Sequence, residues 1–349
     1  MILSAKRANP KVASSYRKTA IFPTVQSLVE SIKKGSTQRP DAAFVGLPPI
    51  AHGTPDSGIE TVIAGAGINF FVDKPVSCNP LHLVKQCGDI VKQSGVIVSV
   101  GYMLRYLKAV KKMQDMIKEH KIHVMATNAT YMSSYATIPK PFWWDVSQCG
   151  GPIVEQGTHL CDLSLHFGGP AKVSTIRAHC IPCPPTPSDS SHMGHLKNVP
   201  SVITEAKLSP ENRIPRITTA IWQYESGAMG TFTHGLVLAG VEKPFQVALE
   251  VWGDGWWLRL ENIYEGGTLK FRRPGSDKVE VATFGNDDPY MTEVIPFVEA
   301  VRKKKAGGQG DVDKASGILC TYEDALRTYE LTWRIRVESE VSAGIGAKL

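Results

Sequence analysis

A lysine and a proline stand directly behind a short apolar run in the segment FFVDKPVS, residues 70–77. The run reads as a buried strand, and ligands of parallel sheets bind beyond the carboxyl ends of such strands. Lys74 is therefore a candidate for proton transfer, because burial and charged neighbours tune the basicity of lysine. An ordinary surface lysine at a strand end is the competing interpretation. Pro75 fixes the backbone beside it, and we expect a cis bond between the two residues.

A second group of ionisable residues lies in GGPIVEQGTHLCDL, residues 150–163. Glu155, His159 and Asp162 share one face if this segment is helical. Histidine titrates near neutrality and suits acid–base catalysis or the binding of a hydroxyl group. We expect His159 to do this chemistry while Asp162 orients its neighbours; a structural histidine is the alternative.

Aromatic and basic residues follow at two further places that a ligand could reach. Tyr102 and Arg105 come just after the next apolar run, so they would line the same cleft as Lys74. Trp143 and Trp144 in PFWWD offer an apolar wall or a face on which a sugar stacks. Buried core is the equally weighted alternative for the two tryptophans.

Cysteine spacing raises the question of a metal site. Cys180-x-x-Cys183 and His192-x-x-His195 have the residue types and spacing of zinc ligands. The segment between them is short and rich in proline, and we predict no metal site. The seven cysteines are an odd number spread over a long chain, which indicates reduced thiols in a cytoplasmic protein.

The elements that must position these residues fall into two blocks. In the first, apolar strands at 41–49, 68–72 and 96–100 alternate with helices at 54–67 and 79–94, and an earlier helix starts at Thr24. Strands that are apolar throughout and alternate with helices predict a parallel sheet covered on both faces. Residues 1–120 are therefore expected to form a partial Rossmann-type domain.

The second block, residues 121–349, has the pattern of an antiparallel sheet. Strand candidates separated by turn residues lie at 123–135, 172–180, 217–226, 229–238, 244–253 and 256–262. Closing helices are expected at 290–303 and 321–339. The predicted fold class is α/β plus α+β, and a length of 349 residues agrees with two domains because single cores stop growing at about 250–300 residues.

The overall composition excludes several classes of protein. Apolar residues make up 42% and charged residues 21%, and no apolar run is long enough to span a membrane. The net charge of +6 is scattered along the chain, which argues against a nucleic-acid partner and allows at most an anionic ligand. No acidic residue precedes Glu30, a bias that is also found in transit peptides.

Taken together, four motifs resemble the Gfo/Idh/MocA family, the glucose–fructose oxidoreductase and inositol dehydrogenase family. They are GLPPIAHG (46–53), VDKPVS (72–77), SVGYMLRY (99–106) and GGPIVEQGTHLCDL (150–163), and the resemblance covers essentially the whole chain. It implies an NAD(P)-dependent oxidoreductase that acts on the CH–OH group of a sugar, sugar acid or related small hydroxy or carbonyl compound. It also implies a homo-oligomer that forms through the second sheet.

The resemblance assigns roles to residues of this sequence. Catalysis falls to Lys74, His159 and Glu155, although the family usually has aspartate at the position of Glu155. Substrate binding falls to Arg105, Trp143, Trp144 and Asp162, and the two basic residues Lys74 and Arg105 would admit an acidic sugar. Contacts to the cofactor fall to Leu47, Pro48, His52, Asp73, Lys74 and Tyr102.

The glycine-rich loop that usually binds a dinucleotide is missing from this sequence. No G-x-G-x-x-G occurs, and Gly65-Ala66-Gly67 precedes a strand rather than a helix. On the family template the chain starts inside the second strand, within residues 2–16, which also accounts for the acid-poor start. Lys6 and Arg7 would then end that strand and favour the 2′-phosphate of NADP, unless they are simply solvated terminal charges. A non-catalytic ligand sensor or regulatory protein, and a truncated form of an active enzyme, are the alternatives.

Overall fold

The computed structural model describes residues 6, 8–135, 138, 140–183, 205–238, 240, 242–307 and 317–345. The chain divides into two compact units, Met1–Pro40 and Asp41–Leu349.

The described part of the N-terminal unit includes the short helices α2 (Ala13–Tyr16) and α3 (Val25–Lys33). Thr24 begins α3 as expected, and its hydroxyl accepts a hydrogen bond from the Ser27 backbone N–H in a capping box. The strand expected within residues 2–16 is not found over 8–16, because local turns such as Ala13 N–H to Asn9 O lead into α2 instead. Lys6 is exposed, whereas Arg7 and residues 1–5 lie outside the described residues.

The second unit opens with a parallel sheet in the order β1-β2-β3. Its strands, β1 (Ala42–Val45), β2 (Asn69–Asp73) and β3 (Val98–Gly101), confirm the three predicted strands. Phe70, Val72 and Val100 are completely buried, which explains why these runs are apolar throughout. Helix α5 (Leu81–Ser94) follows β2 with nearly the predicted bounds of 79–94, and it ends at Gly95 in the left-handed conformation.

Helix α4 is shorter than the prediction of 54–67 and spans only Glu60–Gly65. Thr54 does not cap a helix; its hydroxyl accepts a hydrogen bond from the Ser57 backbone N–H and closes a turn. Gly58 has a φ of 63°, which interrupts right-handed helical geometry before Glu60. The prediction of a long helix was wrong because a turn uses the same residue types as a helix cap.

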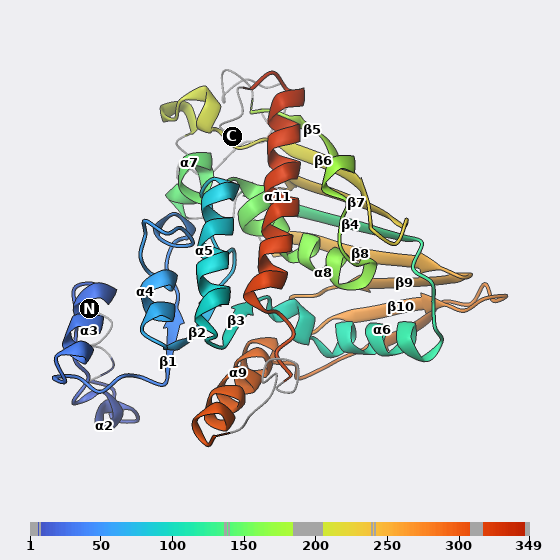
Figure 1. Cartoon of the computed structure of the whole chain (residues 1–349). Coiled ribbons are helices and arrows are strands. Elements are labelled where there is room, and N and C mark those ends of the chain that lie inside the picture. The colour runs from blue at the N-terminus through green and yellow to red at the C-terminus, as the bar shows by residue number, and fades with distance from the viewer. Residues whose placement is uncertain are drawn as a thin grey trace. The chain divides into compact units, whose positions relative to one another are not determined.

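The second sheet has eight strands in the order β11-β10-β9-β8-β4-β7-β6-β5. Figure 1 labels the strands from β10 to β5 in this order. Its strands are β4 (Ala126–Ser134), β5 (Arg177–Ile181), β6 (Ile217–Gln223), β7 (Met229–Leu238), β8 (Phe245–Gly253), β9 (Trp256–Glu261), β10 (Thr268–Arg272) and β11 (Glu280–Thr283). The described strands pair antiparallel except β4 and β7, which are parallel. Strands β10 and β11 were not predicted.

Helices from different parts of the chain pack on the inner face of this sheet, and α11 (Tyr322–Ser342) is one of them, since its Leu331 and Ile335 belong to the same core. Helix α6 (Lys108–Glu119), which was not predicted, and helix α8 (Thr158–Gly168) pack on it to form the main hydrophobic core. Met113 from α6 and Leu160 from α8 lie in this core with Ala129 and Leu249 from β4 and β8.

The two predicted closing helices exist with nearly the expected bounds, α9 (Pro289–Lys305) and α11 (Tyr322–Ser342). Helix α11 runs across both sheets and contacts α5, α8 and β5 (Figure 1). Helix α9 packs on the parallel sheet instead, where Phe297 contacts Phe71. Helix α9, near the end of the chain, thus packs on the parallel sheet formed by residues before 120. For this reason the division of the chain into two domains at residue 120 stays a prediction.

Among the described residues, no helix combines the length and the apolar character that a bilayer crossing requires.

Candidate functional site

The candidate site begins where β2 ends. The Lys74 side chain is only 15% exposed, and its ammonium group donates a hydrogen bond of 2.8 Å to the backbone carbonyl of Glu155. The same nitrogen lies 3.6 Å from Glu155 Oε1. The peptide bond between Lys74 and Pro75 is cis, as expected from the sequence. Lys74 is thus held in a fixed position by a segment 81 residues further along the chain.

Glu155 lies on η5 (Ile153–Gly157), a π-helical turn that leads directly into α8. Its Oε2 atom accepts a 2.7 Å hydrogen bond from the indole N–H of Trp143. Burial favours the neutral acid, but the Lys74 charge and the Trp143 N–H outweigh it and hold the pKa of Glu155 below its usual value. Glu155 is therefore a carboxylate that balances the charge of Lys74.

His159 lies in the first turn of α8 and is 8% exposed. Its ring stands 6.4 Å from that of Tyr102 and 6.3 Å from that of Tyr264. Burial, with the nearby Lys74 charge, lowers the pKa of His159 well below its usual value, so the imidazole is neutral at pH 7. Its buried Nδ1 has no hydrogen-bond partner among the described residues, which costs about 1–3 kcal/mol unless a ligand supplies one.

Arg105 and Asp162, both predicted to bind substrate, are paired with each other. The guanidinium of Arg105 donates hydrogen bonds of 2.8 and 2.7 Å to the two oxygens of Asp162, and Thr328 donates another of 3.0 Å. Both side chains are buried, so the pair ties η2 (Met103–Tyr106) to α8 and α11. This arrangement favours a positioning role, because each charge is already used inside the protein, and direct substrate contact by the pair stays a prediction.

Trp143 and Trp144 are 3% and 2% exposed and lie in a small core with Tyr135, Ile214 and Leu236. They do not form an open wall, so the buried-core alternative describes them better. The link of Trp143 to the site is its hydrogen bond to Glu155.

The residues assigned to the cofactor divide into accessible and buried ones. Leu47 is 43% exposed just after β1, Pro48 beside it is exposed, and so is Asp73 at the end of β2. His52, in contrast, is 1% exposed, and its Nδ1 lies 2.8 Å from Glu60 Oε1, so it anchors its loop to α4 rather than facing a ligand.

Tyr102 is also buried, and its hydroxyl lies 2.7 Å from that of Thr158 at the start of α8. This bond holds the helix that carries His159, which makes a positioning role a better description of Tyr102 than a direct cofactor contact.

Sequence reasoning missed the contribution of the second sheet. Tyr131 on β4 and His234 on β7 pair in register and point inward, with ring centroids 5.5 Å apart. His234 Nε2 lies 2.8 Å from Gln156 Oε1, the residue after Glu155. Burial lowers the pKa of His234 to about 3, so it is a neutral hydrogen-bonding group. The alternation of buried residues along β4 and β7 was the available signal, but it does not distinguish a site from a core.

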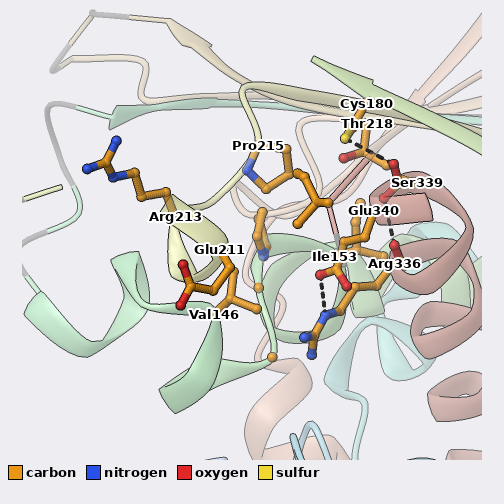
Figure 2. A pocket seen from close by; sticks show the side chains of 14 residues that line it. Val146, Ile153, Cys180, Glu211, Arg213, Pro215, Thr218, Arg336, Ser339 and Glu340 are labelled. Carbon is orange, nitrogen blue, oxygen red and sulfur yellow. Dashed lines mark hydrogen bonds and ion pairs between the residues drawn. The ribbon is translucent and has the colours of Figure 1, made fainter. Parts of the chain in front are cut away.

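A separate pocket lies beside η5, near the end of α11 (Figure 2). Arg336 and Glu340 form an ion pair there, and the Cys180 thiol donates to the Ser339 carbonyl. The pocket holds about 20 Å³, little more than one water molecule, so it cannot take a substrate.

Cys180 of this pocket is also one of the four residues with the spacing of zinc ligands. Cys183 accepts a 3.4 Å hydrogen bond from Arg216, and His192 and His195 lie outside the described residues. The described part of the chain holds no group of three or more side chains placed to bind a metal ion.

Comparisons of the sequence place the chain among oxidoreductase-like proteins. Residues 105–256 match the family described as "Putative oxidoreductase C terminal domain". The chain is 38% identical to the uncharacterized protein UNK4.17 of Schizosaccharomyces pombe over 333 residues, which are 94% of this chain and 77% of that protein.

Comparisons of the structure identify the fold. An inositol dehydrogenase homolog from Azotobacter vinelandii, complexed with NAD+, has a TM-score of 0.68 and 16% identity over 92% of this chain and 81% of that one. A levoglucosan dehydrogenase in complex with NADH and levoglucosan has a TM-score of 0.67 and 14% identity over 98% of this chain and 86% of the other. These matches confirm the predicted fold class, a Rossmann-type parallel sheet followed by a second sheet domain.

Proposed function

The chain belongs to the Gfo/Idh/MocA family of oxidoreductases, and we propose that it transfers a hydride between a nicotinamide cofactor and the CH–OH group of a small sugar, sugar acid or polyol. The main support is the pairing of a fixed, part-buried Lys74 with a neutral, buried His159 at the carboxyl end of a parallel strand. Similar folds are known in complex with nicotinamide cofactors and polyols, which supports the same reaction class here.

The described residues fit the nicotinamide end of such a cofactor. Leu47, Pro48 and Asp73 are accessible at the ends of neighbouring strands, and the unpartnered Nδ1 of His159 marks a place for a polar ligand group. No G-x-G-x-x-G turn occurs in the sequence, so contacts to the pyrophosphate are not assigned. When bound, the nicotinamide would accept or donate the hydride. A preference for NADP rests on Lys6 and Arg7 and belongs to this proposal.

The protein's own part in the reaction is to bind the substrate oxygen and move its proton. Lys74 Nζ is oriented by the carbonyl and carboxylate of Glu155 and exchanges the proton of the substrate hydroxyl. His159 holds the same oxygen or a neighbouring hydroxyl through Nδ1, as a neutral hydrogen-bonding group. The low exposure of both side chains keeps water from competing for these positions.

Two experiments test the proposal, and the first is calorimetric titration of the chain with NADPH and separately with NADH. Micromolar binding of either supports the proposal, and tighter binding of NADPH supports the role of Lys6 and Arg7. Binding of neither cofactor would refute the oxidoreductase proposal for this chain.

The second experiment measures turnover of Lys74→Ala with a panel of sugars and polyols. Loss of a positioned acid or base lowers kcat by about 10²–10⁴-fold, so we expect a loss in this range. Lys85→Ala is the matched control, because Lys85 is a more exposed lysine whose ion pair is with Glu330 of α11 rather than with Glu155. An unchanged kcat for Lys74→Ala would remove Lys74 from the mechanism.

A ligand sensor without catalysis is the second candidate, since the paired Lys74 and the neutral His159 could bind a sugar without transferring its proton. It predicts binding of a sugar with no turnover under any of the cofactor conditions.

We also propose a cytoplasmic homo-oligomer. Cys78, Cys87, Cys149, Cys161, Cys180 and Cys320 are free thiols, and the second sheet exposes Ile221, Val237 and Trp252 on its strands. Light scattering after size-exclusion chromatography would reveal the assembly, and a monomer at micromolar concentration would contradict it.

A further inference from the structure

Helix α9 buries a carboxyl group that the proposed reaction does not use. Glu293 lies near the start of this helix and is 5% exposed. Its Oε2 atom has no hydrogen-bond partner in the part of the chain that the structure describes. Burying a charged carboxylate without a partner is costly, so this position favours the neutral acid.

The packing of α9 on the parallel sheet directs Glu293 towards Asp73. Phe71 and Asp73 are two residues apart on β2, so their side chains point to the same face of the sheet. Glu293 and Phe297 are four residues apart on α9 and share one face of the helix. The rings of Phe71 and Phe297 are in contact, with centroids 5.9 Å apart. The two phenylalanines thus join the two faces that carry the carboxyl groups.

Asp73 connects this arrangement to Lys74. Asp73 is exposed at the end of β2, and its Oδ1 accepts a 2.8 Å hydrogen bond from the backbone N–H of Lys74. Gly101 of β3 pairs in register with Asp73, and a Cβ added at Gly101 would lie 3.3 Å from Asp73 Oδ1. The Asp73 carboxylate therefore lies close against the end of the sheet and holds the backbone that carries Lys74.

The titratable groups around Glu293 come from the elements that pack on α9, which include β2, β3 and η2. Strand β2 contributes Asp73, and η2 contributes Arg105 and Tyr106, whereas β3 contains no titratable side chain. The charge of Arg105 is balanced by its ion pair with Asp162.

Cys320, which precedes α11, and Tyr290 on α9 itself also lie near Glu293. Burial raises the pKa of Tyr106 to about 12, and it raises the pKa values of Tyr290 and Cys320 above their usual values, so all three are neutral at pH 7. Asp73 is thus the charged neighbour that no cation balances in the described part of the chain. Burial, together with the charge of Asp73, raises the pKa of Glu293 to about 8.

We propose that Glu293 is a positioning residue whose neutral form keeps Asp73 and the Lys74 backbone in the arrangement that binds the nicotinamide cofactor, and that ionisation of Glu293 releases the cofactor. This inference rests on the proposed oxidoreductase function, since it adds a residue to the same site.

The physical reason is repulsion between like charges. An ionised Glu293 places a second carboxylate beside Asp73. The exposed Asp73 side chain gives way rather than the buried one, because the packing of α9 fixes Glu293. The backbone N–H of Lys74 then loses its acceptor, and the end of β2 loses the geometry that the cofactor needs.

The test measures NADH binding to the full chain by calorimetric titration at pH 7, 8 and 9, for the wild type, Glu293→Gln and Glu299→Gln. Glutamine keeps the size of glutamate but cannot ionise. Glu299→Gln is the matched control, because Glu299 is exposed on the same helix. Titrations at pH 8 in two buffers of different ionisation enthalpy give the number of protons taken up on binding. Thermal melting at pH 7 verifies that each variant is folded.

If only the neutral form binds, the apparent Kd is the intrinsic Kd divided by the neutral fraction. For a pKa of about 8 this fraction is about 0.9 at pH 7 and about 0.09 at pH 9. The Kd of the wild type and of Glu299→Gln should therefore rise about tenfold between these pH values, and each NADH bound at pH 8 should bring an uptake of about half a proton. In Glu293→Gln both effects should disappear.

A wild-type Kd that does not change with pH, or a tenfold rise that persists in Glu293→Gln, would overturn the inference. Absence of proton uptake by the wild type at pH 8 overturns it even without the variant. These results leave the proposed function in place, because NADH still binds at pH 7. Absence of NADH binding at every pH would instead refute the proposed function, and the inference with it.

Discussion

Replacing Asp162 with asparagine tests whether the buried ion pair with Arg105 holds the site together. Asparagine keeps the shape of the side chain but loses its charge, so it leaves the guanidinium of Arg105 uncompensated at 7% exposure. Removing one partner of a buried, hydrogen-bonded pair costs about 3–5 kcal/mol. Both bonds from Arg105 and the bond from Thr328 end on this carboxylate, so we expect a value within that range.

The expected shift in melting temperature follows from the length of the chain. An unfolding entropy of about 2.1 cal/mol/K per residue gives about 0.7 kcal/mol/K for 349 residues. A loss of 3–5 kcal/mol then lowers Tm by about 4–7 °C. Circular dichroism melts of the wild type and Asp162→Asn measure this directly, with Lys111→Ala as control, since its ion pair with Asp115 is exposed.

The double variant Arg105→Leu with Asp162→Leu makes the reasoning sharper. Replacing both charges with apolar groups should cost less than Asp162→Asn alone, because no buried charge is then left unpaired. A Tm change below about 1 °C for Asp162→Asn, combined with a raised KM, would refute the positioning role and restore direct substrate contact for these residues.

The remaining predictions concern pH and backbone geometry. Burial lowers the pKa of His166 to about 4, so the unfolded chain binds a proton near pH 6.5 that the folded protein refuses. The contribution of His166 to the free energy of unfolding is therefore complete above pH 6.5 and is lost as the pH falls towards 4. Between pH 7 and 5 this histidine lowers the free energy of unfolding by about 2 kcal/mol. Urea unfolding of His166→Gln at the two pH values should show a smaller loss than the wild type. Gly53 has a φ of 79°, and an added Cβ would lie 2.1 Å from the Val76 carbonyl oxygen, so Gly53→Ala should destabilise the protein strongly. Gly169→Ala is the control, because its φ of 89° brings a similar strain with no atom within 4 Å; equal Tm losses for the two variants would contradict the close approach at Gly53.

Local signals in the sequence were sufficient for the elements that deliver Lys74. Apolar runs and intervening helices predicted the parallel sheet, and the side chains of Thr24 and Thr321 cap their helices as their residue types indicate. The position of Lys74 at the end of β2 and its cis bond to Pro75 follow from a stretch of only eight residues. Such features depend on neighbours in the chain, so a short window of sequence contains them.

A short window of sequence failed to predict elements that are stabilised by contacts with distant parts of the chain. Strand β10 and helix α6 were missed because packing on the second sheet, rather than a strong local pattern, stabilises them. The helix expected from residue 54 begins only at Glu60, because the Thr54 hydroxyl, which could have capped a helix, closes a turn instead.

What only the tertiary structure decided is the chemical state of the site. Arg105 and Asp162 neutralise each other across 57 residues, and Trp143 is buried with its N–H on Glu155 instead of facing a sugar. Tyr131, Phe245 and Tyr264 converge from β4, β8 and the turn after β9, which no sequence spacing relates. The residue types alone determine which side chains are capable of proton transfer or ligand binding. Which of these side chains are unpaired and can act depends on burial and on the distances between charges, and both depend on how remote segments pack.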